Sequence, residues 1–383
     1  MEGFGFLSAA FAYPDMQAVE IRGISDLIEG KNDNSVEPED IRQEKASQHA
    51  SAFAFEVLSK LKIISLSQST VPRATQEAFV DYNRALEINL EDAKAYYNRG
   101  NDYYDKGELD LAIADYNRAL EINPEDAKAY YNRGLAYYDK GKLDLAIADY
   151  NRALQINPED AKAYNNRGNA YSDKGELDLA ITNYTQALKI NLEDAKAYNN
   201  RGFAYCKQGE LYLAIADYTQ ALKFNPENAE AYNNRGFAYR KQGELYLAIA
   251  DYTQALKFNP ENAEAYNNRG VAYSDRGELD LAITDFNLAL QINPESAESY
   301  NNCGIAYYDR GELDLAIANF KQAITINPES ADAYANSGVV YSKLGNKQKA
   351  TQDYKKAAQL FAEQGDTAKQ QRVLGRLKQL QQD

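Results

Sequence analysis

Apolar residues recur along this chain at one fixed spacing, and the same order of polar and apolar positions returns every 34 residues. Within each copy, positions 1, 4, 8 and 11 place small and aromatic residues on one stripe of a helix, and positions 17, 20, 21, 24, 27 and 28 do the same for a second helix. Each copy therefore predicts two helices joined by a short turn, which is the unit of a helical solenoid. The copies begin at Ala93, Ala127, Ala161, Ala195, Ala229, Ala263, Ala297 and Ala331.

Residues that start and stop helices stand at fixed places in every copy. Position 34 is Asp, Asn or Ser, whose side chain can accept a hydrogen bond from the free amides at a helix start, as at Asp92. Position 15 is glycine, as at Gly107, which suits the sharp turn after the first helix. Position 32 is proline, as at Pro124, except where Leu192 and Ala362 replace it, and proline cannot continue a helix. The helix boundaries are therefore predicted copy by copy.

The aromatic residues at positions 4 and 24, with Gly at 8, Tyr at 11, Ala at 20 and Pro at 32, resemble the tetratricopeptide repeat (TPR) family. The resemblance covers residues 93–364. It implies an all-α fold, a right-handed superhelical solenoid of helix-turn-helix units with a C-terminal capping helix. The repeats depart regularly from the family pattern at position 7, where an arginine replaces leucine. We expect the guanidinium group of this arginine to form a salt bridge or to face water. Position 7 is Arg99, Arg133, Arg167, Arg201, Arg235 and Arg269, then Cys303 and Ser337.

The segments on either side of the eight copies fit the same scheme. Residues 59–92 match a degenerate ninth repeat, and residues 365–383 match a capping helix with Val373 and Leu380 on its apolar side. The predicted division of the repeat region is 93–126, 127–160, 161–194, 195–228, 229–262, 263–296, 297–330 and 331–364.

The N-terminal segment, residues 1–58, is predicted to be partly disordered. Its apolar run, residues 4–12, is too short to span a bilayer and ends in small residues of the kind that signal peptidases cut. The run is either the remainder of a signal peptide or a disordered or locally packed terminus. A periplasmic and a cytoplasmic localisation of a soluble protein, without stable membrane insertion, both stay open.

Composition excludes several kinds of chemistry. His49 is the only histidine and lies outside the eight copies, so a zinc site of ordinary ligands or a histidine base is not expected. The two cysteines, Cys206 and Cys303, are almost three copies apart. The net charge is -15, which disfavours nucleic acid and anionic membranes as partners. We therefore expect a non-catalytic protein without a cofactor.

Candidate binding residues follow from the TPR resemblance, which implies that the first helices line a concave groove through positions 2, 5, 6, 9, 12 and 13. Position 6 is asparagine in every copy, and a primary amide can pair with a peptide backbone by donating and accepting. This ladder resembles the one that holds extended polypeptide in O-linked N-acetylglucosamine transferases. Two alternatives are recent duplication of one unit and bonding between neighbouring repeats. The ladder is Asn98, Asn132, Asn166, Asn200, Asn234, Asn268, Asn302 and Asn336.

Other groove positions vary from copy to copy. Position 2 is lysine in the first four copies and acidic in the last four, so the predicted groove changes sign along its length, and position 9 becomes apolar from the fourth copy onward. We expect the acidic or carboxylate-bearing part of a peptide near copies 1 to 4 and its apolar or basic part near copies 5 to 8. The candidate residues are Lys94, Lys128, Lys162 and Lys196 at position 2, Tyr97 and Tyr131 at position 5, and Tyr104 and Tyr138 at position 12.

Three further functions are less favoured by the sequence. Asn101, Asn132 and Lys162 supply only part of the clamp with which some family members bind the C-termini of chaperones. Aspartates recur at position 13 and could bind a divalent cation, but single carboxylates one repeat apart are expected to be too distant to share an ion. The sequence of the copies is similar to that of bacterial, especially cyanobacterial, members of the TPR family. This similarity suggests an assembly factor for a photosynthetic or membrane complex. A non-catalytic scaffold or adaptor that binds an extended protein segment is the favoured prediction.

Overall fold

The computed structural model describes residues 82, 86, 89 and 91–382, and within them the chain forms seventeen α-helices and no β-strand. The predicted N-terminal segment, residues 1–58, lies outside the described residues, as does nearly all of the predicted degenerate repeat, residues 59–92. The prediction of an all-helical solenoid of helix-turn-helix units is confirmed.

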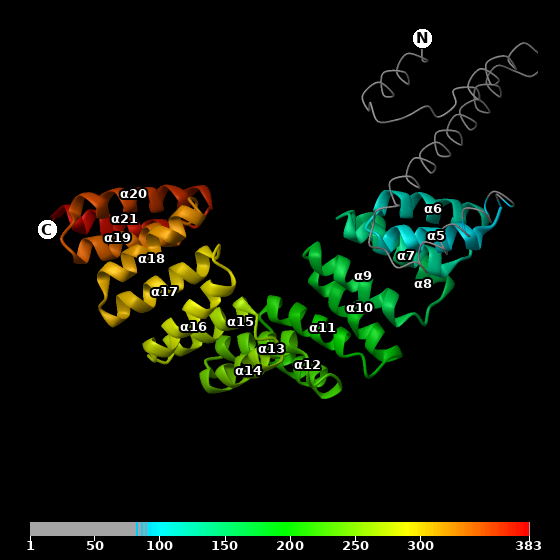
Figure 1. The fold of residues 1–383 in the computed structure, drawn as a ribbon, viewed down its shortest axis with the longest axis horizontal. Helices are drawn as coiled ribbons and strands as arrows, with labels where there is room; N and C mark the ends of the chain where they lie inside the picture. The colour runs from blue at the N-terminus through cyan, green and yellow to red at the C-terminus, as the bar shows by residue number, and fades with distance from the viewer. Residues whose placement is uncertain (1–81, 83–85, 87–88, 90, 383) are drawn as a thin grey trace, which may run out of the picture. The chain divides into compact units, whose positions relative to one another are not determined.

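Eight helix pairs follow one another in chain order and are closed by one further helix (Figure 1). The first helices are α5 (Ala93–Asp105), α7 (Ala127–Asp139), α9 (Ala161–Asp173), α11 (Ala195–Gln208), α13 (Ala229–Lys241), α15 (Ala263–Asp275), α17 (Ala297–Arg310) and α19 (Ala331–Lys343). The second helices are α6 (Leu109–Ile122), α8 (Leu143–Ile156), α10 (Leu177–Ile190), α12 (Leu211–Phe224), α14 (Leu245–Phe258), α16 (Leu279–Ile292), α18 (Leu313–Ile326) and α20 (Lys347–Glu363). The closing helix is α21 (Thr367–Gln382).

The first helices begin where the capping residues predict. The Asp92 side chain accepts a hydrogen bond from the Ala95 amide at 3.0 Å, and the residue at position 34 does the same in every later repeat. Gly107 after α5 has φ 74°, a left-handed conformation that side chains other than glycine's rarely adopt. The turn between the two helices of a repeat therefore depends on position 15.

Proline is not the only feature that ends the second helices. Leu192 replaces it after α10, yet α10 still ends at Ile190 with Asn191 as its C-cap residue. Where Ala362 replaces it, α20 continues to Glu363 and has 17 residues, compared with 14 in α18. The asparagine at position 31, which is missing only from the last repeat, accompanies the shorter helices.

Within each repeat, the two helices meet where glycine at position 8 faces the aromatic residue at position 24. Tyr116 is 1% exposed, and a Cβ added to Gly100 would lie 2.7 Å from its ring. Phe286 and Phe320 occupy the same place in repeats 6 and 7. Any larger residue at position 8 would push the helices apart, which is why the position is glycine throughout.

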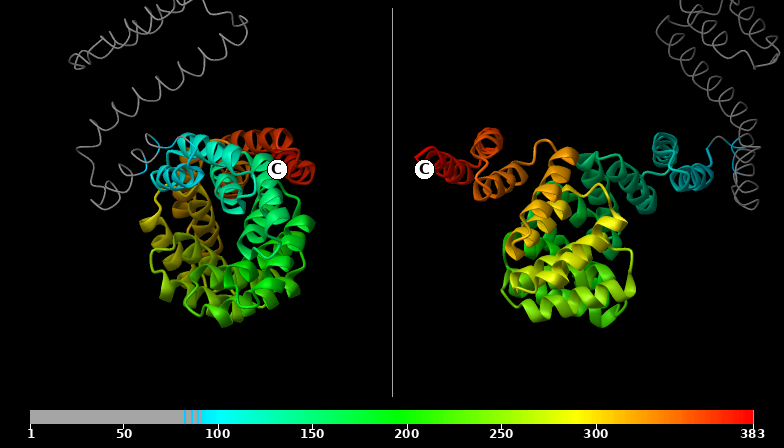
Figure 2. Two further views of the ribbon diagram at one scale, coloured as in Figure 1. Left: turned by 90° about the vertical axis from the view of Figure 1, so that its right-hand side faces the viewer. Right: turned by 60° about the vertical axis from the view of Figure 1, so that its left-hand side comes forward.

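Repeats pack on one another through the helices nearest in sequence. Each second helix contacts the next first helix, and each first helix also contacts the first helix of the following repeat. In the described part of the chain, adjacent second helices make no comparable contact. The first helices therefore lie closer together than the second helices and form the inner side of the stack. Figure 2 shows the stack of helix pairs from two further directions. We call positions 2, 5, 6, 9, 12 and 13 of the first helices the A-helix face.

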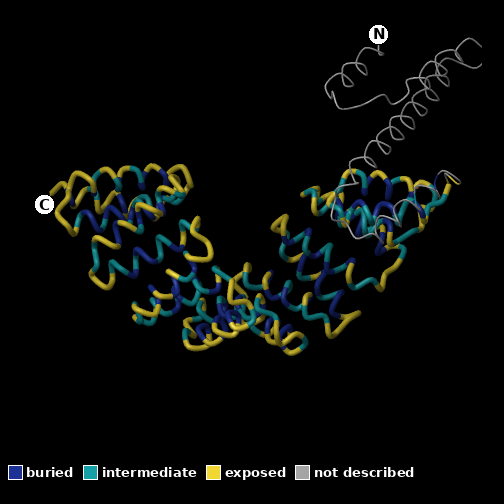
Figure 3. Tube along the Cα trace, in the orientation of Figure 1, coloured by how far each residue is buried: buried dark blue, intermediate teal, exposed yellow. Residues whose placement is uncertain are grey.

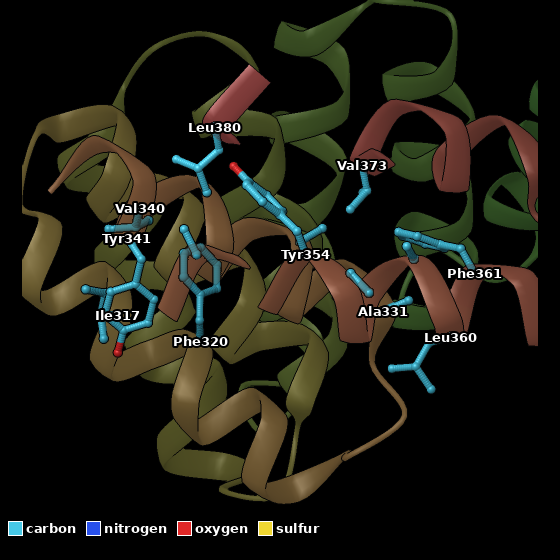
Figure 4. Packing of buried hydrophobic residues seen from close by; sticks show 14 of the residues in the cluster. Ile317, Phe320, Ala331, Val340, Tyr341, Tyr354, Leu360, Phe361, Val373 and Leu380 are labelled. Atoms are coloured by element: carbon cyan, nitrogen blue, oxygen red, sulfur yellow. The ribbon is translucent and has the colours of Figure 1, made fainter. Parts of the chain in front are cut away.

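Buried positions recur along every helix pair, and exposed residues gather at the turns and on outward helix sides (Figure 3). The last repeat is covered by α21, which packs on α20. Val373 and Leu380 of α21 are buried with Tyr354 and Phe361 of α20 (Figure 4). The predicted capping helix is thus confirmed as the element that covers the final apolar surface.

The arginine at position 7 has a definite partner, which is the aspartate at position 23 on the second helix of the same repeat. Arg99 Nε and Nη2 donate to the two carboxylate oxygens of Asp115, each at 2.7 Å, and both side chains are buried. The guanidinium also lies 5.5 Å from the ring of Tyr96 and 6.0 Å from that of Tyr103. The same ion pair forms in four other repeats, as Arg133–Asp149, Arg201–Asp217, Arg235–Asp251 and Arg269–Asp285.

The same arginine also reaches the preceding repeat. Arg133 Nη1 donates to Asn117 Oδ1 at 2.6 Å, and Arg235 Nη1 donates to Thr219 Oγ1 at 3.1 Å. One guanidinium therefore joins its own first helix, its own second helix and the previous second helix. A bidentate, charge-assisted arrangement of this kind fixes orientation as well as distance.

Repeats 3, 7 and 8 depart from this pairing. Arg167 faces the neutral Asn183 at 2.7 Å, and burial lowers the pKa of the arginine. In repeat 7 the arginine is replaced by Cys303, which is buried in a cluster with Ile283 and Phe286 of α16, and in repeat 8 the Ser337 hydroxyl donates to Asp353 at 2.7 Å. Burial raises the pKa of Asp353, which has no arginine opposite.

We expect Asn183→Asp to raise the free energy of unfolding by about 1 kcal/mol, because it gives Arg167 the carboxylate found in five other repeats and the gain exceeds the cost of desolvating it. Asn319→Asp in repeat 7 is the matched control: it places the same new carboxylate opposite Cys303, with no arginine to pair with, and should lower stability. Urea unfolding followed by circular dichroism measures both changes. Equal effects of the two substitutions would contradict the pairing.

Candidate functional site

The eight predicted ladder asparagines all lie on the A-helix face and are half-buried. From the second repeat onward, each donates its side-chain Nδ2 to the residue at position 5 of the preceding repeat. The acceptor is a tyrosine hydroxyl for Asn132 (Tyr97, 3.0 Å) and Asn166 (Tyr131, 2.8 Å). It is an asparagine Oδ1 for Asn200, Asn234, Asn268, Asn302 and Asn336, at 3.0 to 3.3 Å. The alternative of bonding between repeats is therefore observed.

This bonding uses only part of each amide. An asparagine side chain has two N–H donors and an oxygen with two lone pairs. For Asn132 and its six later equivalents, no donor within residues 91–382 bonds to the Oδ1 atom. The link to the neighbouring repeat thus holds each amide in one orientation and leaves its oxygen without a hydrogen bond in the described structure.

Carboxylates at position 2 set that orientation in the second half of the stack. Asn199 Nδ2 donates to Glu230 Oε1 at 3.0 Å, which turns the Asn199 oxygen toward Asn234. An ionised carboxylate only accepts hydrogen bonds, so the Asn199 nitrogen has to face Glu230. The Asn199 oxygen therefore faces Asn234, and Asn234 has to donate the hydrogen bond between them. Glu264 and Glu298 hold the next two amides in the same way.

The lysines at position 2 in the first half of the stack do not orient the amides of the ladder. Lys94, Lys128, Lys162 and Lys196 are exposed, and none of them pairs with a carboxylate of the described residues. The predicted change of sign at position 2 therefore separates uncommitted lysines from glutamates that are already hydrogen-bonded.

The four candidate tyrosines connect the first three repeats. Tyr97 and Tyr131 accept from the ladder, and their rings lie 6.2 Å and 6.0 Å from those of Tyr116 and Tyr150. The Tyr104 hydroxyl donates to Asp139 and the Tyr138 hydroxyl donates to Asp173. Burial, assisted by the facing carboxylate, raises the pKa of Tyr104 and of Tyr138, so both phenols stay protonated as donors.

Three of the five aspartates at position 13 bond to protein groups. Tyr104 and Tyr138 bond to Asp139 and Asp173, and Arg240 pairs with Asp275 at 3.2 Å. Within the described residues, no three His, Cys, Asp or Glu side chains lie close enough to hold one metal ion. These contacts support the interpretation that the aspartates serve structure and solvation.

Position 9 decides whether the buried tyrosine at position 24 has a partner. Asn101 accepts from the Tyr116 hydroxyl at 2.8 Å, and Asn169 accepts from that of Tyr184 at 2.9 Å. Repeats 6 and 7 have valine or isoleucine at position 9 and phenylalanine at position 24. In repeats 2 and 5 a tyrosine at position 24 follows an apolar residue at position 9, Leu135 or Phe237, and the Tyr150 and Tyr252 hydroxyls have no hydrogen bond in the described structure.

Two features of the A-helix face did not enter the predicted site. The asparagines at position 5 (Asn165, Asn199, Asn233, Asn267 and Asn301) carry the ladder, and their regular recurrence was a signal for that role. Lys207 and Lys241 replace aspartate at position 13 in repeats 4 and 5, and this reversal of charge was also visible in the sequence.

None of the helices in the described part of the chain is long and apolar enough to cross a bilayer. This finding leaves the compartment open.

Comparison with protein families identifies the repeat unit. A family described as "TPR repeat" matches residues 100–141, 134–175, 168–209, 204–243, 238–275 and 306–345. Families described as "Tetratricopeptide repeat" match residues 263–296 and residues 331–364. Together these matches span well over half of the chain.

Comparison with known structures shows the same fold. A chain of the APC/C hetero-tetramer Cut9–Hcn1 is similar over 68% of this chain and 52% of its own length, with 20% identity and a TM-score of 0.54. A tetratricopeptide repeat protein from Parabacteroides merdae ATCC 43184 is similar over 67% and 98%, with 24% identity and a TM-score of 0.53. PilW, a type IV pilus biogenesis factor, is similar over 54% and 96%, with 22% identity and a TM-score of 0.51. The chain thus spans about half the length of the Cut9–Hcn1 chain that it matches, and no curated protein sequence matches it.

We expect Tyr150→Phe and Tyr116→Phe to change stability in opposite directions. Removing the unpaired Tyr150 hydroxyl should raise the free energy of unfolding by about 1 kcal/mol, whereas removing the Tyr116 hydroxyl breaks its bond to Asn101 and should lower it by about 1 kcal/mol. The midpoint of denaturant unfolding measures both. A loss in Tyr150→Phe as large as that in Tyr116→Phe would show that the Tyr150 hydroxyl has a partner after all.

Proposed function

The chain belongs to the tetratricopeptide repeat family, and we propose on that basis that it is a non-catalytic scaffold or adaptor whose A-helix face binds an extended segment of a partner protein. The single observation that carries the proposal is the oriented amide ladder. It offers one uncommitted carbonyl oxygen per repeat over seven consecutive repeats.

A ladder of this kind suits a peptide backbone better than a particular side chain. Each peptide group of an extended chain carries an N–H that needs an acceptor once water is removed. The ladder oxygens can supply that acceptor whatever the ligand's sequence. The second N–H can donate to a peptide carbonyl in Asn166, Asn234, Asn268, Asn302 and Asn336, whereas Asn132 and Asn200 use theirs to bond to Asn101 and Asn169. Because the amides are already held in place, binding does not have to order them, which favours affinity.

Side chains beside the ladder give the face a direction. The uncommitted lysines at position 2 support placing acidic or carboxylate-bearing parts of the ligand along repeats 1 to 4. Apolar residues at position 9, which begin in repeat 4, support placing the apolar or basic part of the ligand along repeats 5 to 8. These residues are Phe203, Phe237, Val271, Ile305 and Val339.

Two narrower functions have less support. Two of the three residues of the partial chaperone-tail clamp bond to each other, since Asn132 Nδ2 donates to Asn101 Oδ1 at 2.8 Å. A role as a bacterial or cyanobacterial assembly factor, with or without a divalent metal, stays a prediction from the amino-acid sequence of the repeats.

We expect the double variant Asn200→Ala with Asn234→Ala to weaken peptide binding several-fold, because two ladder oxygens are lost. The probe is a twelve-residue peptide selected on the full chain from a random display library, and its Kd is measured by fluorescence polarisation. The matched control, Thr219→Ala with Thr253→Ala, also removes two hydrogen bonds between repeats, but on the second helices.

Equal stability losses with weaker binding only in the asparagine variant would support the ladder as a ligand site. If both double variants bound the peptide as the parent does, the ladder would serve only to join repeats.

We expect charge reversal of Lys94, Lys128, Lys162 and Lys196 to glutamate to weaken binding of acidic peptides from the same selection by roughly ten-fold or more at low salt. The difference should shrink in 500 mM NaCl, because screening removes long-range attraction. Unchanged binding at low salt would refute the assigned direction of the ligand.

A further inference from the structure

Repeats 4 and 5 are the only two of the eight repeats that combine a phenylalanine at position 9 with a lysine at position 13, since repeat 8 has Lys343 at position 13 but Val339 at position 9. Position 9 is phenylalanine only in these repeats, and position 13, aspartate in five other repeats, is lysine in both. We call Phe203, Lys207, Phe237 and Lys241 the Phe–Lys patch. Since α11 and α13 contact each other directly, its two halves are neighbours.

Cation and ring lie together in each half of the patch. Lys207 Nζ is 4.6 Å from the centroid of the Phe203 ring, and Lys241 Nζ is 5.3 Å from that of Phe237. Phe203 is 42% exposed, so its ring offers apolar surface to solvent beside an ammonium group. A ligand side chain that packs on the ring would bring its neighbours within reach of the lysine.

The positive charge of the patch is uncommitted. Neither Lys207 nor Lys241 pairs with a carboxylate of the described residues. Three carboxylates of the A-helix face in repeats 3, 5 and 6 are bonded to other groups, because Asp173 accepts from Tyr138, Asp275 from Arg240 and Glu230 from Asn199. The patch is therefore complementary to acidic groups and repels basic ones.

The spacing of the repeats limits the form of the ligand. Packed helices lie about 8 to 10 Å apart. A polyproline II segment has three residues per turn and rises about 3.1 Å per residue, so one turn advances by about 9 Å. Every third side chain of such a segment faces the same way, and so does every third peptide group. One turn of ligand per repeat would match both the amide ladder and the two lysines.

We propose that the Phe–Lys patch binds an extended partner segment in which acidic residues recur at every third position beside an apolar residue. This inference rests on the proposed function, and it extends the cationic part of the face by one repeat beyond Lys196. A nucleic acid would also bring stacking and negative charge, but the backbone-directed ladder and the net charge of -15 favour a peptide.

Three labelled peptides test the proposal on the full chain by fluorescence polarisation. The first is (Glu-Pro-Val)4, the second replaces each Glu with Lys, and the third has the composition of the first with its four glutamates placed together. We expect the first to bind most tightly and to weaken with added salt, because periodic carboxylates meet both lysines.

The double variant Lys207→Glu with Lys241→Glu should weaken binding of the first peptide by roughly ten-fold or more. Its matched control is Lys223→Glu with Lys257→Glu, which makes the same charge change in the same repeats. Those lysines lie on the second helices, each 5.5 Å from the ring of a phenylalanine, Phe224 or Phe258. The control should bind the first peptide within about two-fold of the parent, since it alters only the long-range field.

Three outcomes would overturn the inference while the proposed function stands: equal binding of the acidic and basic peptides, equal binding of the periodic and clustered acidic peptides, or no effect of the patch variant. Tighter binding of a twelve-nucleotide oligo(dT), competing at the patch, would overturn it in favour of a nucleic acid. If none of the peptides bound and no library peptide could be selected, the proposed function itself would fail.

Discussion

The close approach of the two helices within each repeat is the constraint on which the rest of the structure depends. Glycine at position 8 leaves room for the aromatic ring at position 24, and a Cβ at Gly168 would lie 2.6 Å from the ring of Tyr184. This contact fixes the distance and rotation of the first helix against the second. It therefore also decides that position 6 lies on the A-helix face while positions 4, 8 and 11 lie toward the core. The candidate site depends on a residue that takes no part in it.

Local features of the fold could be predicted from the sequence because their causes are local. A side chain that accepts from the amide three residues ahead starts a helix, as Asp92 does, and a glycine such as Gly107 permits the left-handed turn that follows. Apolar spacing then assigns the inward faces. The same signals recur eight times, so each copy supports the others, and the capping helix follows from the need to cover the last apolar surface.

Partners across helices could not be predicted in the same way. Arg99 meets Asp115, which is sixteen residues away on another helix, and the sequence left open whether such an arginine pairs or faces water. The amide of Asn200 meets Asn165 in the preceding repeat, so a position expected to face a ligand also holds the stack together. Only packing shows that the side chain uses its nitrogen for the neighbouring repeat while its oxygen has no partner within the described residues.

The regularity of the ladder gives no defined alignment to a ligand that binds it only through the ligand's own peptide backbone. A segment shorter than the A-helix face could slide by one repeat and make an equivalent set of bonds, so that several alignments would be populated at once. Seven equivalent alignments would make the free energy of binding more favourable by about 1 kcal/mol through their number alone. They would also leave the ligand without one defined position on the A-helix face. The phenylalanines and lysines of repeats 4 and 5 break this translational symmetry. A local difference of that kind makes one alignment of the ligand more stable than the others.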